Sequence, residues 1–526
     1  MSAGAAFNLI LKDDRFDKYF TMTSYLQDRI NQIKAKRKAS GETIVEPTFA
    51  DIERTHKLYI LGGYKPYVAL ASEYVRVSAS GDGSSAVSTA GGTLDFKFPA
   101  YGHFTSDMVV HIKFSAIGTQ LTDTTLIGGP SAPPAPFLRY CALPGVRLFR
   151  RVILRSGSTS IDDYTPEDVV SRSKFFIGAN HRQGWERCMG QQEQREATFY
   201  GNGFTGSMLY RDGPQTPKQY QESFDLFIPL QFWFCDDMSS ALFNEMIPNT
   251  QRQIVCELAP LRDIVQALIP GVSSNPLIPT GMTPTELPFQ RLAIRAELYV
   301  NSVCVNPEIY DIFASRCTAK LIRVHRRHTL TFSNPLESFL LNNLKFPLEY
   351  LMVGVRSRGV LQDFDRWWMM GSVRTRSNSN KLLAPAMIWN PTIVPSGMAQ
   401  LVVRECVDVS SLDNLVDTIG VTAQGIELMI DCPAVFYNAY IPIRYTKNSL
   451  VVSPVDTGSF LITFSIYPGK FDPSGYYNMS AGRELYLNLG LKVEPQEVGG
   501  VEAVLTGIML NLLLYRGDGL ALKYSL

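Results

Sequence analysis

The chain has 526 residues, of which 45% are hydrophobic and 19% are charged. This composition excludes a disordered or low-complexity protein and leaves room for about three ordinary domains or two large β-sandwiches. The 50 basic and 49 acidic side chains leave a net charge of +1, so we expect no direct genome binding. The low charge density favours extensive contact with other subunits.

The first sixty residues differ in pattern from the rest. Leu26, Ile30 and Ile33 recur at helical spacing and predict a short amphipathic helix from Ser24 to Lys38 on an N-terminal arm. The basic residues of this helix are Arg29, Lys34, Lys36, Arg37 and Lys38. The first residues lack the features of a secretory signal, and no apolar run reaches the roughly 20 residues of a membrane helix. We therefore expect a cytosol-like compartment.

Beyond the arm, hydrophobic and polar residues alternate with the period of half-buried strands. Val110, Ile112 and Phe114, for example, alternate with His111 and Lys113. Similar runs, separated by turn-rich segments, lie at Tyr74 to Ser78, Leu94 to Phe98, Val146 to Leu154, Phe224 to Phe234, Gln253 to Leu258, Ala293 to Val305, Lys320 to Phe332, Tyr350 to Val355, Gly425 to Ile430, Phe460 to Ile466, Leu485 to Leu489 and Val504 to Tyr515. We expect an all-β protein built from jelly-roll or immunoglobulin-like sandwiches.

Helical signals inside this region are few and short. Thr165, Pro166 and Asp168 combine a cap, a first-turn proline and an early acid, which predicts a helix start. The segments Asp237 to Phe243 and Pro307 to Phe313 could each form about two helical turns. We expect these helices to lie in loops between strands.

A weak internal duplication suggests two copies of one sandwich. Phe96-Lys97-Phe98-Pro99 follows the strand around Val75, and Leu344-Lys345-Phe346-Pro347 follows the strand around Ile322 at a similar distance. The natural joint is the segment Pro307 to Cys317. The resulting organisation is an arm at 1–60, a first sandwich at 61–315 and a second at 316–526.

The usual signatures of catalysis and cofactor binding are absent from the sequence. There is no P-loop, dinucleotide fingerprint, nucleophile elbow or HExxH motif. His325 and His328 would face opposite sides of a strand, so we expect no metal site there. The neighbouring acids Asp162-Asp163 and Asp236-Asp237 do not specify an acid/base pair. We predict a protein without catalytic, metal or cofactor sites.

Two aromatic clusters and the cysteines fit a structural protein. Phe232-Trp233-Phe234 and Trp367-Trp368 could stack on bases or sugars, but in a large sandwich such clusters favour the core or a subunit interface. The eight cysteines are scattered singly, which predicts reduced thiols.

Motifs along almost the whole chain resemble the double jelly-roll major capsid proteins of nucleocytoplasmic large DNA viruses, most of all the African swine fever virus type. They include Lys65-Pro66-Tyr67-Val68, Pro144-Gly145-x-Arg147-Leu148, Asp162-Asp163-Tyr164, Gly213-Pro214-Gln215-Thr216-Pro217, Glu297-Leu298-Tyr299-Val300-Asn301, Leu321-Ile322-Arg323-Val324-His325, Leu344-Lys345-x-Pro347-x-Glu349-Tyr350 and Pro473-Ser474-Gly475. Segments near 118–137, 179–210 and 371–417 do not match and look shorter than their counterparts.

The resemblance implies two tandem jelly rolls and a homotrimeric, pseudo-hexagonal capsomer that tiles the icosahedral shell of a large double-stranded DNA virus. Partners would be further copies of the chain, neighbouring capsomers and minor capsid proteins, with the basic helix of the arm facing these proteins or the inner viral membrane. The protein would reside in the virion after assembly in the host cytoplasm. Alternatives are a minor capsid or spike protein, or a carbohydrate-binding β-sandwich protein.

Overall fold

The computed structural model describes most of the chain outside the N-terminal arm and several loops. The described residues are 23–41, 70–99, 101–118, 136–191, 194–201, 204–211, 213–244, 252–271, 282–305, 310, 319–375, 382–387, 402–407, 410–446, 450–479, 484–516 and 519–524.

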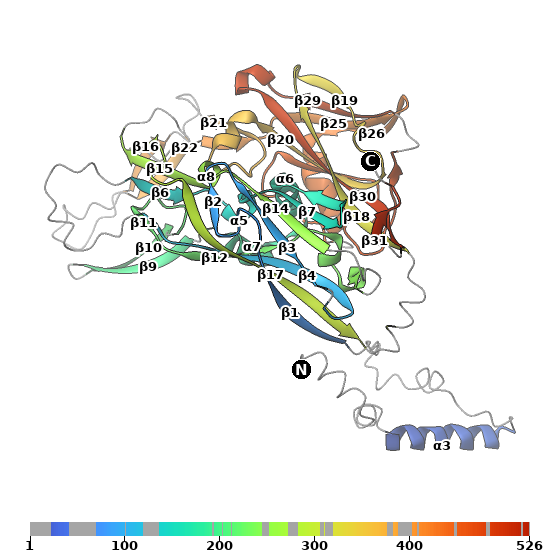
Figure 1. Ribbon diagram of the computed structural model, residues 1–526. Coiled ribbons are helices and arrows are strands. Elements are labelled where there is room, and N and C mark those ends of the chain that lie inside the picture. Colours follow the sequence, from blue (N-terminus) through green and yellow to red (C-terminus); the bar gives the residue numbers. More distant parts are fainter. Residues whose placement is uncertain are drawn as a thin grey trace.

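The first half of the chain forms a sandwich of two antiparallel sheets (Figure 1). One sheet has the order β1 (Leu70–Ser78), β17 (Arg291–Val305), β4 (Phe104–Phe114) and β12 (Phe224–Pro229). The facing sheet has the order β3 (Gly92–Lys97), β14 (Arg252–Leu258), β7 (Phe149–Ser156) and β8 (Thr159–Tyr164). Strands distant in sequence therefore lie side by side, as in a jelly roll.

The second half repeats this arrangement strand for strand. Its first sheet has the order β18 (Ala319–Thr331), β30 (Val501–Arg516), β20 (Pro347–Ser357) and β27 (Ser459–Thr463). Its second sheet has the order β19 (Leu336–Leu340), β29 (Leu485–Leu491), β25 (Val416–Ala423) and β26 (Ile426–Pro433). The expected all-β fold of two tandem jelly rolls is confirmed.

The sequence echo falls in the same connection of both jelly rolls. Phe96 and Phe98 lie at the end of β3, before β4, and Leu344 and Phe346 lie between β19 and β20; all four side chains are buried. The expected domain limits near residues 60 and 315 and most of the joint at 307–317 lie outside the described residues, so these limits stay a prediction.

Both sandwiches carry strands in addition to those of the main sheets. They are β2 (Ala86–Ser88), β5 (Ile117–Gly118), β6 (Phe137–Tyr140), β9 (Gln194–Gly201), β10 (Phe204–Arg211), β11 (Tyr220–Gln221), β13 (Leu242–Phe243), β15 (Val265–Pro270), β16 (Met282–Thr285), β21 (Ser372–Thr375), β22 (Leu382–Met387), β23 (Val402–Val407), β24 (Ser410–Asp413), β28 (Tyr477–Asn478) and β31 (Gly519–Leu522). Several of them pair only with each other in small two- or three-stranded sheets.

Helices are short and lie mostly in the connections. The α-helices are α3 (Thr23–Ala39), α5 (Pro144–Arg147), α6 (Pro166–Phe176), α7 (Ala179–Cys188), α8 (Leu261–Ile264) and α10 (Ile441–Thr446). A π-helix, η6 (Phe436–Tyr440), precedes α10, and short 3-10 helices are η2 (Trp233–Cys235), η3 (Met238–Ser240), η4 (Arg358–Gln362) and η7 (Pro495–Val498). In the described part of the chain, no helix is long and apolar enough to cross a membrane.

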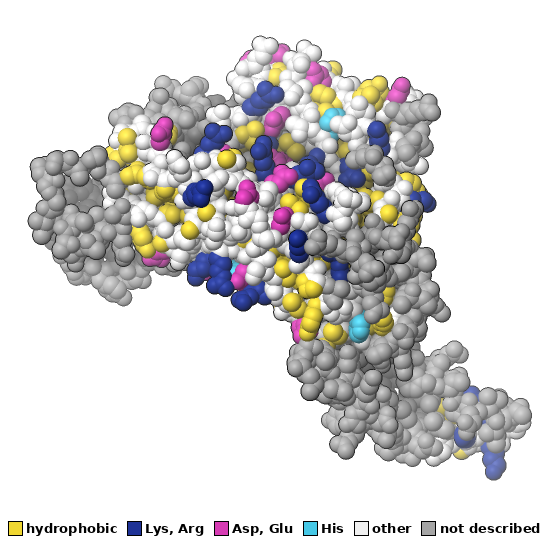
Figure 2. Space-filling model, viewed as in Figure 1, with side chains coloured by type: hydrophobic (Ala, Val, Ile, Leu, Met, Phe, Trp, Pro, Cys, Tyr) yellow, Lys and Arg dark blue, Asp and Glu magenta, His cyan; other side chains and the backbone are white. Residues whose placement is uncertain are grey.

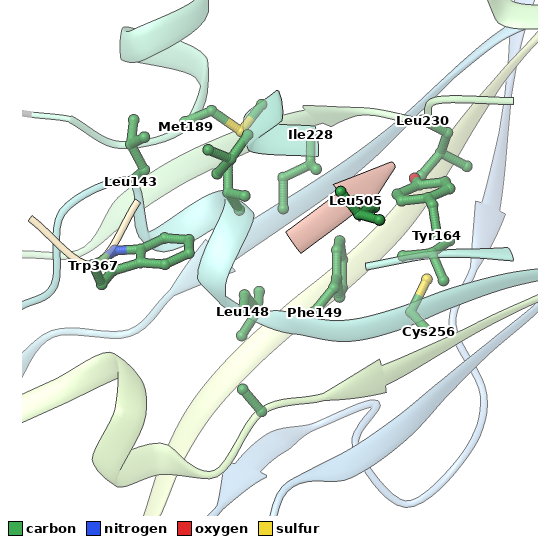
Figure 3. Packing of buried hydrophobic residues seen from close by; sticks show 14 of the residues in the cluster. Leu143, Leu148, Phe149, Tyr164, Met189, Ile228, Leu230, Cys256, Trp367 and Leu505 are labelled. Atoms are coloured by element: carbon green, nitrogen blue, oxygen red, sulfur yellow. The ribbon is translucent and has the colours of Figure 1, made fainter. Parts of the chain in front are cut away.

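The core follows the alternation predicted from the sequence. Val110, Ile112 and Phe114 are fully buried, whereas Lys113 between them is exposed. Buried side chains of both sandwiches join into one large apolar cluster, and Figure 3 shows Trp367 of the second half beside Leu143 of the first. The two jelly rolls therefore share a hydrophobic contact in addition to their separate interiors.

Three local predictions were wrong. The strand expected from Val146 starts only at Phe149, because Pro144 opens the short helix α5. The strand expected to reach Phe234 ends at Pro229, and Trp233 and Phe234 lie in the 3-10 turn η2. The two helical turns expected after Asp237 are reduced to η3 and the short strand β13. In each case the segment packs its apolar side chains against the core, which does not require a regular element.

Candidate functional site

The contact between the two sandwiches, which we call the seam, carries the densest group of buried charges. From the first sandwich it contains β8 and α6, and from the second it contains the outer face of β18, β30, β20 and β27. Several motifs that resemble those of capsid proteins meet here, including Asp162-Asp163-Tyr164 on β8 and Arg323-Val324-His325 on β18. The seam is therefore the first candidate for a functional role.

A histidine and a carboxylate pair across the seam. The Nδ1 atom of His325 lies 2.9 Å from Oδ2 of Asp162, and the backbone N–H of His325 donates to Oδ1 of Asp162 at 2.9 Å. Burial alone would lower the pKa of His325, but the negative charge of Asp162 and its hydrogen bond raise it above the ordinary value. Both oxygens of Asp162 are thus occupied by one residue of the other sandwich.

Arg327 on β18 continues this contact toward helix α6. Its Nη1 donates to Oδ2 of Asp168 at 3.0 Å, and its Nη2 donates to Oδ2 of Asp163 at 2.5 Å. Burial would raise the pKa of Asp163, but Arg327 and Arg151 hold it below the usual value. Since guanidinium groups hold carboxylates in a fixed geometry, Arg327 fixes the position of β8 and α6 on β18.

Asp168 has two further roles at the start of α6. Its Oδ2 accepts the backbone N–H of Thr165 at 2.8 Å, which confirms the helix start predicted from Thr165 and Pro166. Its Oδ1 accepts the hydroxyl of Thr506 on β30 at 2.8 Å. One buried carboxylate therefore caps a helix of the first sandwich and binds two strands of the second.

The far end of α6 is held by a buried lysine and a phenylalanine. Lys174 is 1% exposed and pairs with Asp456, while its Nζ also lies 3.3 Å from Oγ of Ser459 on β27. Burial lowers the pKa of Lys174, and the charge of Asp456 opposes that shift. Next to this pair, Phe175 packs against an apolar group of the second sandwich formed by Tyr350, Met352, Val451, Leu461 and Ile508.

A second set of contacts joins α5 to the segment after η4. The indole Nε1 of Trp367 donates to the carbonyl of Ala142 at 2.7 Å, and the backbone N–H of Ala142 donates to the carbonyl of Phe364 at 2.7 Å. The guanidinium of Arg147 lies 5.2 Å from the ring centre of both Phe364 and Trp367. The motif around Pro144 and Gly145 thus also contributes to the contact between sandwiches.

A cavity of about 940 Å³ lies within the seam. Phe176, Trp185 and Trp233 line it from the first sandwich, and Leu321 and Tyr350 line it from the second. Two arginines in the lining are already paired, Arg172 with Asp236 and Arg323 with Glu349. The lining of the cavity therefore contains both acidic and basic side chains, and neither charge predominates.

The geometry of the seam supports a structural role. The residues that the sequence analysis considered for catalysis or ligand binding have other contacts. Asp162 is bound by His325, Asp163 is bound by Arg327, and Trp233 is buried in the core. Among the described residues no group of three or more histidines, cysteines and acids could hold a metal ion. Of the basic side chains on β18, Arg327 belongs to the contact between the sandwiches.

Other seam residues were missed by sequence reasoning. Glu349 and Arg356 are charged residues within the strongly apolar strand β20, and this unusual pattern could have identified them. Arg356 donates to Glu502 at 2.8 Å and lies 3.5 Å from Glu167 of α6, while Glu349 binds Arg323. Lys174 and Asp456 carry no comparable signal, because they are distant in sequence and look like ordinary surface residues.

The five basic residues named for the arm lie on α3, as predicted. Lys36 and Lys38 are exposed, and Lys34 and Arg37 are half-buried, while the side chain of Arg29 lies outside the described residues. The expected amphipathic character is wrong: charged residues interrupt the apolar positions of α3, so the helix has no clear apolar face. Figure 1 shows α3 apart from the two sandwiches.

Among the cysteines that the structure describes, none forms a disulfide: Cys141, Cys188, Cys235, Cys256, Cys304 and Cys432 are free. Cys317 and the side chain of Cys406 lie outside the described residues. Burial raises the pKa of Cys141 to about 12, so this thiol is unreactive at neutral pH.

Comparisons with known proteins agree with the fold. No protein-family model matches the chain. The hexon protein p72 of one African swine fever virus isolate and the major capsid protein of another are each 26% identical to this chain over 660 aligned positions, covering all of this chain and all of each relative. The alignment is longer than the chain, so the relatives contain segments that this chain lacks.

The structural comparison gives the same result. The Faustovirus major capsid protein is 25% identical, covers 95% of this chain and 99% of its own, and superposes with a TM-score of 0.69. A capsid structure of PBCV-1 is 15% identical, covers 88% of this chain and 98% of its own, and superposes with a TM-score of 0.58, a similarity of fold. Sequence and structure together relate this chain, over its whole length, to the double jelly-roll major capsid proteins of large DNA viruses.

Proposed function

We propose that three copies of this chain form a pseudo-hexagonal capsomer that tiles the icosahedral shell of a large double-stranded DNA virus. The observation that carries this proposal is the repetition of one strand order in both halves of the chain. Three copies of a chain with two similar sandwiches, arranged around a three-fold axis, have a nearly hexagonal outline. Hexagonal outlines can tile a surface. The names of the related proteins support the same role.

The role that we propose for this protein is that of a structural component of the virion and not of an enzyme. The buried carboxylates Asp162 and Asp168 and the half-buried Asp163 bind His325 and Arg327 of the neighbouring sandwich, which supports a stabilising role. A net charge of +1 provides no field for direct genome binding. We propose that the chain needs no cofactor, that it assembles in the host cytoplasm, and that its partners are further copies, neighbouring capsomers and minor capsid proteins.

The experiment that tests the capsomer combines light scattering with electron microscopy of the purified protein. We expect the mass of three chains and a hexagonal outline. A folded protein with the mass of one chain at micromolar concentration would contradict the proposal. The number of copies in purified particles would distinguish a major capsid protein from a minor capsid or spike protein, because the former dominates the particle.

For the N-terminal arm we propose an inward-facing contact with minor capsid proteins or the inner membrane. Lys36 and Lys38 on α3 are exposed, and each basic residue near an anionic surface contributes about 1 kcal/mol. Deleting residues 1–45 should leave trimers intact and reduce the yield of closed shells. Replacing Lys34, Lys36, Arg37 and Lys38 by glutamine tests charge alone, and unchanged particle yield in both variants would refute the contact.

A further inference from the structure

The connection between β26 and β27 starts with helices that are too short to be stable alone. The π-helix η6 has five residues and α10 has six, and the described residues 450–458 then lead the chain back to β27. Isolated helices of this length are marginal in water, and π-helices are rare and frequently lie at functional sites. Contacts outside the two helices must therefore hold this connection in place.

One carboxylate in this connection, that of Asp456, receives a cation from the first sandwich. Its Oδ2 pairs with Nζ of Lys174 on α6 and accepts the backbone N–H of Met370 at 2.8 Å. Its Oδ1 is buried and has no hydrogen-bond partner among the described residues. The side chain of Asp456 is 7% exposed, and within the described part of the chain its ion pair is with Lys174 alone. The charge of Asp456 therefore depends on the docking of α6.

The backbone next to this carboxylate holds the π-helix. Nδ2 of Asn438 on η6 donates to the carbonyl of Asp456 at 3.0 Å and to the carbonyl of Ser459 at 2.8 Å. The hydroxyl of Ser459 in turn lies 3.3 Å from Nζ of Lys174. A short path of polar contacts therefore leads from α6, through residues 456 and 459, to η6.

An apolar contact joins the same elements. Phe175 on α6 is buried in one group with Val451, and Ile441 and Tyr445 of α10 pack against this group. The carbonyl of Phe175 also accepts the backbone N–H of Val452 at 2.6 Å. Figure 2 shows acidic and basic side chains gathered over α6, where the sandwiches meet, whereas Phe175 is 1% exposed. The end of α6 thus supports the connection through its side chains and its backbone.

We propose that the docking of α6 on the second sandwich orders the connection from β26 to β27, with Lys174 and Phe175 as positioning residues. η6 and α10 expose Val435, Tyr440 and Ile443, which are 66%, 53% and 62% exposed. This apolar surface then forms only in a chain whose two sandwiches have joined, and a chain with separate sandwiches does not present it. The inference concerns the single chain and does not rest on the proposed capsomer.

Hydrogen exchange of the full-length protein, followed by mass spectrometry of its peptides, tests this coupling. In Lys174→Met the carboxylate of Asp456 stays buried without its cation. We expect the backbone amides of residues 436–446 and 450–458 to exchange roughly a hundredfold faster than in the unchanged protein. The amides of β25 and β29 should exchange as before, because these strands lie in the other sheet of the second sandwich.

A matched control and a rescue separate the coupling from a general loss of stability. Arg172→Met also removes a cation from α6, but Arg172 pairs with Asp236 of the first sandwich, so exchange in 436–446 should not change. The double variant Lys174→Met with Asp456→Asn removes both charges and keeps an acceptor for the N–H of Met370. It should slow the exchange again by about tenfold or more.

Unchanged exchange of residues 436–446 in a folded Lys174→Met protein would refute the coupling. An equal rise in all strands of the second sandwich would also refute it, because the contact would then support the whole sandwich. If Lys174→Met does not fold by circular dichroism, Phe175→Leu replaces it, and unchanged exchange of α10 in that variant would overturn the proposal. Light scattering ensures that proteins of equal mass are compared. A one-chain mass of the unchanged protein would refute the capsomer and leave the coupling standing.

Discussion

Replacing Asp168 by alanine should weaken the seam more than the loss of any exposed ion pair. The carboxylate caps α6 through Thr165 and receives Arg327 at 3.0 Å and Thr506 at 2.8 Å. Loss of a helix cap costs about 1 kcal/mol. Removing one partner of a buried ion pair costs about 3 kcal/mol here, the low end of the usual range, because Arg327 is partly exposed and keeps Asp163.

The expected loss is therefore about 4 kcal/mol in the free energy that holds the two sandwiches together. In a melting curve this corresponds to about 8 to 16 °C for a unit of roughly 200 residues. Hydrogen exchange of the backbone amides in α6 and β18 should rise together, because both elements depend on the same carboxylate.

The matched control is Asp236→Ala. Asp236 also pairs with an arginine of α6, Arg172, but within the first sandwich, and its side chain is 43% exposed. Partly exposed pairs contribute about 1 kcal/mol or less. If Asp168→Ala lowers the melting temperature no more than Asp236→Ala, the buried network does not hold the seam and the reasoning is refuted.

Three further predictions concern the seam and the thiols. The pKa of His325 is raised in the folded protein, so its pairing with Asp162 stabilises the fold. This contribution is complete below about pH 6.5, the ordinary pKa of an unfolded histidine, and is lost as the pH rises through the pKa of the folded state. As the pH rises through this range, the melting temperature of the unchanged protein should fall, whereas that of His325→Gln should not. Identical pH profiles of the two proteins would argue against the pairing. Trp367→Phe should cost about 1 kcal/mol through the lost bond to Ala142, and Trp367→Ala about 3 to 5 kcal/mol, measured by denaturant unfolding; equal losses would contradict the role of the ring. Thiol counting after denaturation should find eight free groups, and six would reveal a disulfide.

Periodic patterns predicted the sheets well and the contacts between them poorly. From Ser106 to Phe114, strand β4 strictly alternates buried and more open positions, which is a local signal. The segment Phe232 to Phe234 is equally apolar, but it turns in η2 because its rings fill space between elements, and local pattern does not specify that geometry. The helix start at Thr165 was predictable, since capping depends on residues three apart.

The seam was hardest to predict because its partners are distant in sequence. His325 and Asp162 are separated by 163 positions, and Lys174 and Asp456 by 282. Each of these side chains, taken alone, has the pattern of an exposed strand or helix residue. The sequence analysis considered His325 as a metal ligand and Asp162-Asp163 as an acid pair, and the resemblance placed both in capsid-protein motifs. None of these patterns indicated that the two segments meet.

The position of β30 in its sheet determines when the second jelly roll can close. This strand lies between β18 and β20 and pairs with both, yet it comes near the end of the chain. While the ribosome is still completing the chain, β18 and β20 each lack their shared neighbour and expose a row of unpaired backbone groups. The first jelly roll has the same arrangement, since β17 lies between β1 and β4. Each half therefore folds only after its last long strand emerges, and the nascent chain is exposed to mispairing with other chains during that interval.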